Sequence, residues 1–130
     1  MPRRKSPALT DAELRIMNVL WDRGPGTVGE VVDGIAGPRK PAYNSVLTIL
    51  RILERKGYVT HQKEGRAFTW VTAIGRNDAR RGALSHVLSR FFDGSPELLV
   101  LNLLGRDEPR PEDVERVRAL IHRSQREHTR

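Results

Sequence analysis

Short polar side chains and arginines share one face of a helix that the sequence predicts at residues 42–56. At about 100° per residue, the polar side chains from Asn44 to Arg55 fall within about 60° of one another, opposite the apolar residues. Asparagine and threonine can bond to base edges or phosphates, and arginine can bind guanine or a phosphate. The pattern favours a helix that reads the DNA major groove, although an ordinary amphipathic helix with a solvated face is the alternative. The predicted base-reading set is Tyr43, Asn44, Ser45, Thr48 and Arg51.

The net charge of +7 on the 130-residue chain is unevenly distributed. Residues 39–66 carry seven basic and two acidic side chains, whereas residues 9–38 carry two basic and five acidic ones. A basic excess confined to one segment is typical of a phosphate-binding face. Arg3, Arg4 and Lys5 add a basic tail, which suits either further contacts or a disordered end. The predicted phosphate-binding residues are Arg39, Lys40, Arg55, Lys63 and Arg66.

Helix and strand signals along residues 1–75 follow the order of a known DNA-binding fold. Two capping boxes, at residues 10–13 and 27–30, predict the starts of two helices. The third helix is closed by Gly57 and is followed by two predicted strands, residues 58–63 and 67–72. Gly65 lies in the link between them, where a tight turn favours positive φ. We therefore expect a mainly α fold with a small β-hairpin, in which residues 1–75 form a winged helix-turn-helix domain.

Residues 76–130 are predicted to be a helical dimerisation domain. Asn77 and Asp78 are expected to cap a long helix, and Ser95 to cap a short one that is apolar almost all round. The apolar stripes exceed what three short helices can bury among themselves, which favours a second copy as partner. The alternative is that the stripes pack onto the N-terminal domain. The predicted dimerisation residues are Leu84, Val87, Leu88, Phe91, Leu99, Leu103, Val114, Val117, Leu120 and Ile121.

The composition speaks against an enzyme. There is no cysteine, and the four histidines lack the spacing of metal ligands. The chain has no glycine-rich phosphate loop, no G-x-S-x-G elbow and no S-x-x-K motif. We therefore expect no catalytic residue, metal, cofactor or small-molecule substrate. Because the chain lacks a long apolar run and an apolar N-terminal stretch, we expect a cytoplasmic protein.

Several segments together resemble one family. They are Met17–Trp21, residues 42–51 in the third helix, residues 55–59 at its end, and residues 92–95 followed by 99–102. In order and spacing they are similar to the BlaI/MecI-type transcriptional repressors, the penicillinase repressor family. The resemblance implies a homodimer of winged-helix domains, held together by C-terminal helices, that covers an inverted-repeat operator. Leu47 stands where some members carry arginine, and we include it in the base-reading set.

The same resemblance implies a route of inactivation. Family members that work beside a β-lactam sensor are cleaved in the short apolar helix, and the corresponding bond here joins Asn102 to Leu103. A membrane metalloprotease sensor is therefore an expected partner. Leu103 departs from the phenylalanine of the best-known members. The absence of cysteine excludes the copper-responsive branch, which uses a C-terminal cysteine cluster.

Two other functions remain open from the sequence. One is a ligand-responsive winged-helix regulator whose C-terminal helices form an effector pocket. The other is a basic RNA-binding or ribosome-associated protein, although the chain has few aromatic residues for stacking on single strands.

Overall fold

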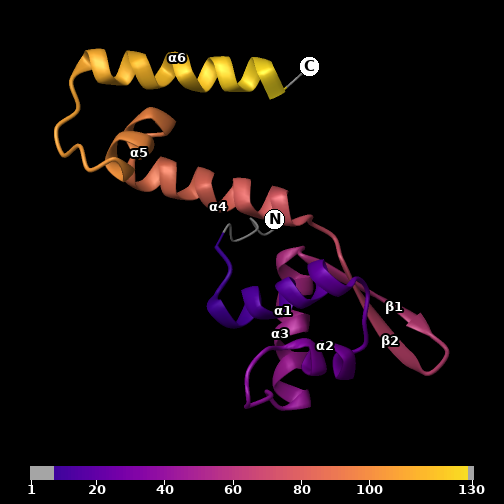
Figure 1. The fold of residues 1–130 in the computed structure, drawn as a ribbon. Helices are drawn as coiled ribbons and strands as arrows, with labels where there is room; N and C mark the ends of the chain where they lie inside the picture. The colour runs from indigo at the N-terminus through magenta and orange to yellow at the C-terminus, as the bar shows by residue number, and fades with distance from the viewer. Residues whose placement is uncertain (1–7, 129–130) are drawn as a thin grey trace. The chain divides into compact units, whose positions relative to one another are not determined.

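A computed structural model of the chain describes residues 8–128 (Figure 1). The basic tail of Arg3, Arg4 and Lys5 lies outside these residues. Within them the fold is mainly helical with one antiparallel hairpin, which confirms the predicted fold class. The elements are α1 (Asp11–Arg23), α2 (Val28–Gly34), α3 (Tyr43–Lys56), β1 (Val59–Glu64), β2 (Ala67–Thr72), α4 (Arg76–Phe91), α5 (Pro96–Leu103) and α6 (Pro111–His128).

The first helices begin where the capping boxes predict. The Thr10 hydroxyl accepts from the Glu13 amide at 3.1 Å, and the Glu13 carboxylate accepts from the Thr10 amide at 2.8 Å. The Thr27–Glu30 pair caps α2 in the same way. Gly57 ends α3 in the left-handed region, with φ of 89°, a conformation that glycine adopts without a steric penalty. These local signals fix where α3, the predicted reading helix, lies along the chain.

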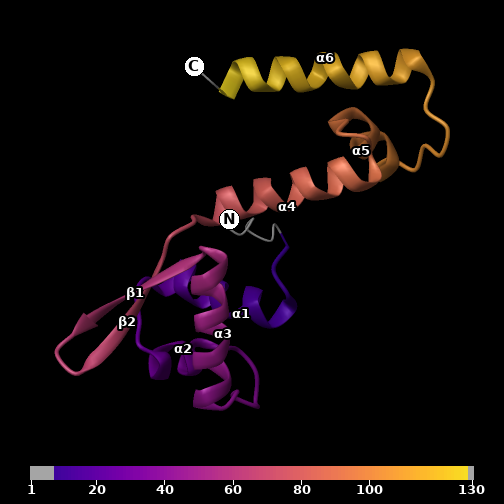
Figure 2. The same cartoon turned by 180° about the vertical axis from the view of Figure 1, so that it is seen from behind.

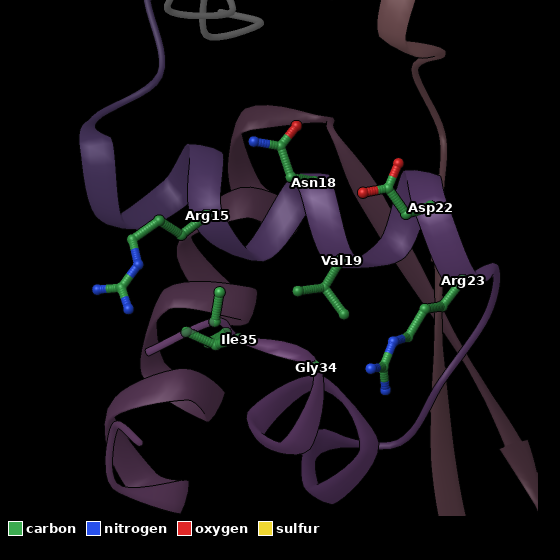
Figure 3. A pocket seen from close by; sticks show the side chains of 8 residues that line it. Arg15, Asn18, Val19, Asp22, Arg23, Gly34 and Ile35 are labelled. Atoms are coloured by element: carbon green, nitrogen blue, oxygen red, sulfur yellow. The ribbon is translucent and has the colours of Figure 1, made fainter. Parts of the chain in front are cut away.

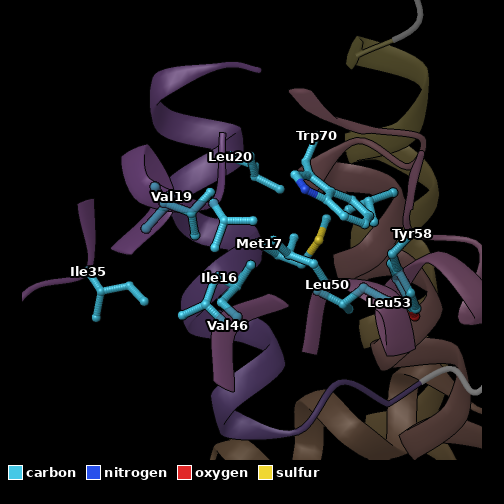
Figure 4. Packing of buried hydrophobic residues seen from close by; sticks show 13 residues of the cluster. Ile16, Met17, Val19, Leu20, Ile35, Val46, Leu50, Leu53, Tyr58 and Trp70 are labelled. Carbon is cyan, nitrogen blue, oxygen red and sulfur yellow. The ribbon is translucent and has the colours of Figure 1, made fainter. Parts of the chain in front are cut away.

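The core of the first part of the chain lies among α1, α2, α3 and the hairpin (Figure 4). Met17, Leu50 and Leu53 are fully buried at its centre, and Trp70 of β2 closes one side. The main chain of Trp70 also pairs with Gly26, with N···O distances of 2.8 and 3.1 Å. The loop before α2 is therefore tied to the hairpin, and the base of the hairpin is fixed against the helices.

The hairpin projects away from the three helices, as both views show (Figure 1, Figure 2). Its register pairs His61 with Trp70 and Lys63 with Phe68. Because side chains alternate between the faces of a strand, these four share one face. Gly65 forms the turn with φ of 63°. The first strand begins at Val59 rather than at the predicted Tyr58, because the Tyr58 amide bonds to Leu53 O and completes the end of α3.

The chain divides into two compact units between Ala83 and Leu84, inside α4, whereas the sequence predicts a boundary after residue 75. In the second unit α5 packs on α6, and Leu101 and Val117 are its buried apolar residues. Ser95 caps α5 as predicted, accepting from the Leu98 amide at 3.2 Å. The predicted cap of α4 is wrong: the helix begins at Arg76, so Asn77 and Asp78 lie in its first turn.

Candidate nucleic-acid interface

The polar face of α3 is exposed along its length. Val46, Leu50 and Leu53 point into the core, and the opposite side of the helix faces solvent. Leu47 differs from the rest of the predicted base-reading set, since it is half-buried and packs against the core. The exposed members of that set are Tyr43, Asn44, Ser45, Thr48 and Arg51, and Arg55 of the phosphate set is exposed beyond them.

The hydroxyl of Thr48 is already partly used. It donates to the Asn44 carbonyl, one turn earlier, at 2.9 Å. A threonine that bonds back to its own helix keeps its acceptor lone pairs and its methyl group for an outside partner. At a major groove these groups suit an amino donor or the methyl of thymine. Thr48 therefore has a narrower range of contacts than its residue type alone implies.

The predicted phosphate-binding residues fall into two groups. Arg39, Arg55, Lys63 and Arg66 are exposed. The Lys40 ammonium instead donates to the carbonyl of Asp33, at 3.1 Å, and to that of Ile35. Both carbonyls lie at the end of α2, where a positive charge offsets the helix dipole and satisfies free acceptors. Lys40 thus stabilises the connection between α2 and α3.

A buried ion pair links the start of α1 to the end of α3. The Lys56 ammonium lies 2.8 Å from each carboxylate oxygen of Glu13, whose side chain is almost fully buried. Burial raises the pKa of the Glu13 carboxyl, but bonds from Lys56 and Thr10 lower it by more, so this pKa lies below its usual value. The pair holds α3 in position from its end opposite the polar N-terminal turn. Sequence reasoning identified Glu13 only as a capping residue and missed the pairing.

The start of α4 is fixed to α1 by Arg76. Its guanidinium bonds to Asp22 at 2.7 Å and to Asn18 at 3.4 Å, and lies 5.3 Å from the ring centre of Trp21. The Trp21 indole N–H donates to the Ile74 carbonyl at 2.9 Å. Asn18 and Trp21 belong to the Met17–Trp21 motif. Their contacts show that this motif anchors the segment that leaves the first unit.

Two depressions of the first unit bear on function. One, of about 240 Å³, lies between α1 and α2, where the side chains of Arg15 and Arg23 extend on either side of Val19 (Figure 3). Gly34 contributes to its wall, and a Cβ there would approach Val19 to 2.5 Å, so the two helices pack too closely for a side chain. The other depression, of about 350 Å³, separates α3 from the hairpin and contains Arg51 and Arg55.

The described residues hold no enzymatic site that we can identify. Residues 8–128 contain no cluster of three or more His, Cys, Asp or Glu side chains placed to hold a metal. Over the same residues, every helix is too short or too polar to span a bilayer. The exposed polar face of α3 and the projecting hairpin are the features that remain, and they define a winged-helix DNA-binding protein.

Comparisons with known proteins agree with this class. The family described as "Penicillinase repressor" matches residues 9–123. The penicillinase repressor of Bacillus licheniformis is 31% identical over 111 residues, which are 85% of this chain and 87% of that protein. The transcriptional regulator BlaI of Mycobacterium tuberculosis is 30% identical over 104 residues, 78% of this chain and 75% of that protein. The chain belongs to the penicillinase repressor family, whose members are transcriptional repressors and not enzymes.

A solved structure supports the fold of the first unit. The solution structure of the DNA-binding domain of the repressor BlaI is 32% identical to this chain and superposes with a TM-score of 0.50. The match covers 58% of this chain and 93% of that domain. The recognised fold is therefore that of a winged-helix DNA-binding domain.

Proposed function

We propose that the chain is a sequence-specific transcriptional repressor that binds an inverted-repeat operator as a homodimer in the cytoplasm. The observation that carries this proposal is the exposed polar and basic face of α3, held on a buried core beside a hairpin whose turn region is basic. The printed function of the relatives supports the same assignment.

The residues of this face would divide into two roles. Those near the N-terminal half of α3 carry groups that match base edges, and those further out carry charge for the phosphates. Lys40 is left out of the phosphate set because its ammonium is bonded to the end of α2. The proposed base-reading residues are Tyr43, Asn44, Ser45, Thr48 and Arg51, and the proposed phosphate contacts are Arg39, Arg55, Lys63 and Arg66.

Dimerisation through the second unit is supported by its exposed apolar side chains. Phe91 is 73% exposed, Leu103 77% and Leu120 62%. Apolar surface of this extent is usually covered by a partner. Leu84 and Val87 are also exposed, whereas Leu88, Leu99, Val114 and Ile121 are half-buried and Val117 is buried within the unit. A two-fold dimer would present two copies of α3 to two half-sites.

Inactivation by cleavage between Asn102 and Leu103 is also part of the proposal. Both residues are exposed at the end of α5, where a short helix needs to unwind only its last turn to enter a protease. A membrane metalloprotease sensor is the proposed partner. Incubation with that sensor should give two fragments whose masses place the cut after Asn102, and an intact chain would contradict this step.

The experiment that tests the main proposal is selection of binding sites from a pool of random DNA duplexes. We expect enrichment of an inverted repeat whose half-sites lie one or more helical turns apart. Footprinting on the selected duplex should then protect both half-sites together. Enrichment of no duplex, or stronger competition by RNA than by the selected DNA, would contradict the proposal and favour an RNA-binding role.

A further inference from the structure

The depression between α3 and the hairpin has a charged floor and apolar walls. Arg51, Glu54 and Arg55 line it from α3, and His61, Phe68 and Trp70 line it from the hairpin, with Leu47 at its edge. Phe68 is 51% exposed although it is a large apolar residue. We call this depression the α3–hairpin cleft. It adjoins the exposed face of α3, so a DNA strand that follows that face would pass it.

Glu54 and His61 connect the two sides of the cleft. The Nδ1 atom of His61 lies 2.5 Å from Glu54 Oε2, and both side chains are partly exposed. The imidazole packs edge-on against Phe68, with ring centres 5.3 Å apart, and against Trp70 at 5.1 Å. Because a carboxylate accepts hydrogen bonds, the Nδ1 atom carries the proton of the neutral ring. The Nε2 atom is then left to take up a second proton from solvent.

The charge at this position conflicts with DNA binding. Glu54 places a carboxylate between two arginines on the side of α3 that faces the hairpin, and a DNA phosphate there would be repelled by it. The other charged group on the facing side of β1 is Lys63, and β2 contains no ionisable side chain. His61 is therefore the titratable group in contact with Glu54 that can change its charge near neutral pH.

We propose that the α3–hairpin cleft holds a segment of the sugar–phosphate backbone of the operator, and that His61 is a positioning residue which offsets the Glu54 charge by binding a proton. Arg51 and Arg55 flank the phosphate, and the exposed ring of Phe68 contacts the deoxyribose. The phosphate favours the imidazolium form, so DNA binding takes up a proton at His61 Nε2. This inference rests on the proposed function, since it requires that α3 binds duplex DNA.

The consequence is that operator affinity increases as the pH falls. Uptake of one proton changes the dissociation constant by at most about tenfold per pH unit. Between pH 8 and pH 6 we expect the Kd of the full-length protein for the selected inverted repeat to fall about three- to tenfold more than in the His61→Gln variant. A His122→Gln variant is the matched control, because His122 is an exposed histidine of α6.

Fluorescence anisotropy at fixed ionic strength, from pH 6 to pH 8, measures this difference. His61→Gln should flatten the pH profile, His122→Gln should leave it unchanged, and Glu54→Gln should bind at pH 8 about as tightly as the wild-type chain binds at pH 6. A wild-type profile retained in His61→Gln, or weaker binding by Glu54→Gln at pH 8, would overturn the inference. Failure of the wild-type chain to bind any inverted repeat would instead overturn the proposed function.

Discussion

The two units of the chain bury their apolar residues to very different extents. Thirteen buried hydrophobic side chains form the core of the first unit, whereas Leu101 and Val117 are the buried ones among the described residues of the second. The second unit instead exposes large apolar side chains on all three of its helical segments. The first unit thus has the core it needs to fold alone, while the second has an apolar surface that a partner would cover. Reading DNA and pairing copies are therefore separable properties of one short chain.

The largest expected effect comes from removing the second unit. A chain that ends at Ala83 keeps Arg76 and its contacts with α1, so it should unfold cooperatively and remain monomeric. Its affinity for the selected inverted repeat should fall about 100-fold or more, because two linked heads bind with a high effective concentration. Sedimentation and anisotropy measure the two quantities. A dimer formed by this truncated chain would contradict the assignment of pairing to the second unit.

A single charge on the exposed apolar surface should separate the copies without unfolding the first unit. Phe91→Asp would bury an unpaired carboxylate in the proposed interface, and we expect the dimer dissociation constant to increase about 30-fold or more. Ser89→Asp, on the same helix, is the matched control. Equal effects of both substitutions on dimerisation, measured by sedimentation equilibrium, would show that Phe91 lies outside the interface.

Within the first unit, Arg51 and Arg55 should differ in kind. Arg51→Ala removes a proposed base contact and should weaken binding to the inverted repeat by about 1–3 kcal/mol, with little change on random DNA. Arg55→Ala removes a proposed phosphate contact, so both DNAs should lose affinity equally. The slope of log K against log salt should then fall by about 0.9 for each lost phosphate contact in a complex. An equal loss on both DNAs for Arg51→Ala would move Arg51 to the phosphate set.

Local sequence signals predicted the elements of the first unit well. Both capping boxes and the glycine at the end of α3 act through residues a few positions apart, and each is found where expected. The position of Leu47 was also readable, because it lies about 100° from the centre of the apolar face and so falls at the margin of the core. The missed signal was the angle itself, since Leu47 entered the predicted set through family resemblance.

Contacts between distant residues were not predictable in the same way. Lys56 and Glu13 are 43 residues apart, and no local pattern indicates that they meet. Lys40 reads as one more basic residue, yet its ammonium bonds to carbonyls at the end of α2. In both cases a charge that the sequence counts toward DNA binding is used to hold the fold. Net charge therefore overstates the number of groups available to phosphates.

The smallest expected effect tests whether the first unit is stable independently of dimerisation. Because the folded pKa of Glu13 lies below its usual 4.5, its ion pair stabilises the fold above about pH 4.5, and this stability is lost as the pH falls through the folded value. Lys56→Met leaves the Glu13 charge unpaired and should lower the free energy of unfolding at pH 7 by about 1–3 kcal/mol, with a weaker dependence on acid pH. Arg55→Met, one residue earlier and exposed, should leave the free energy unchanged. Urea unfolding of the chain ending at Ala83, between pH 3 and pH 7, measures these differences. A midpoint that rises with protein concentration would contradict the independence of the first unit, because a monomer unfolds at a midpoint that does not depend on concentration.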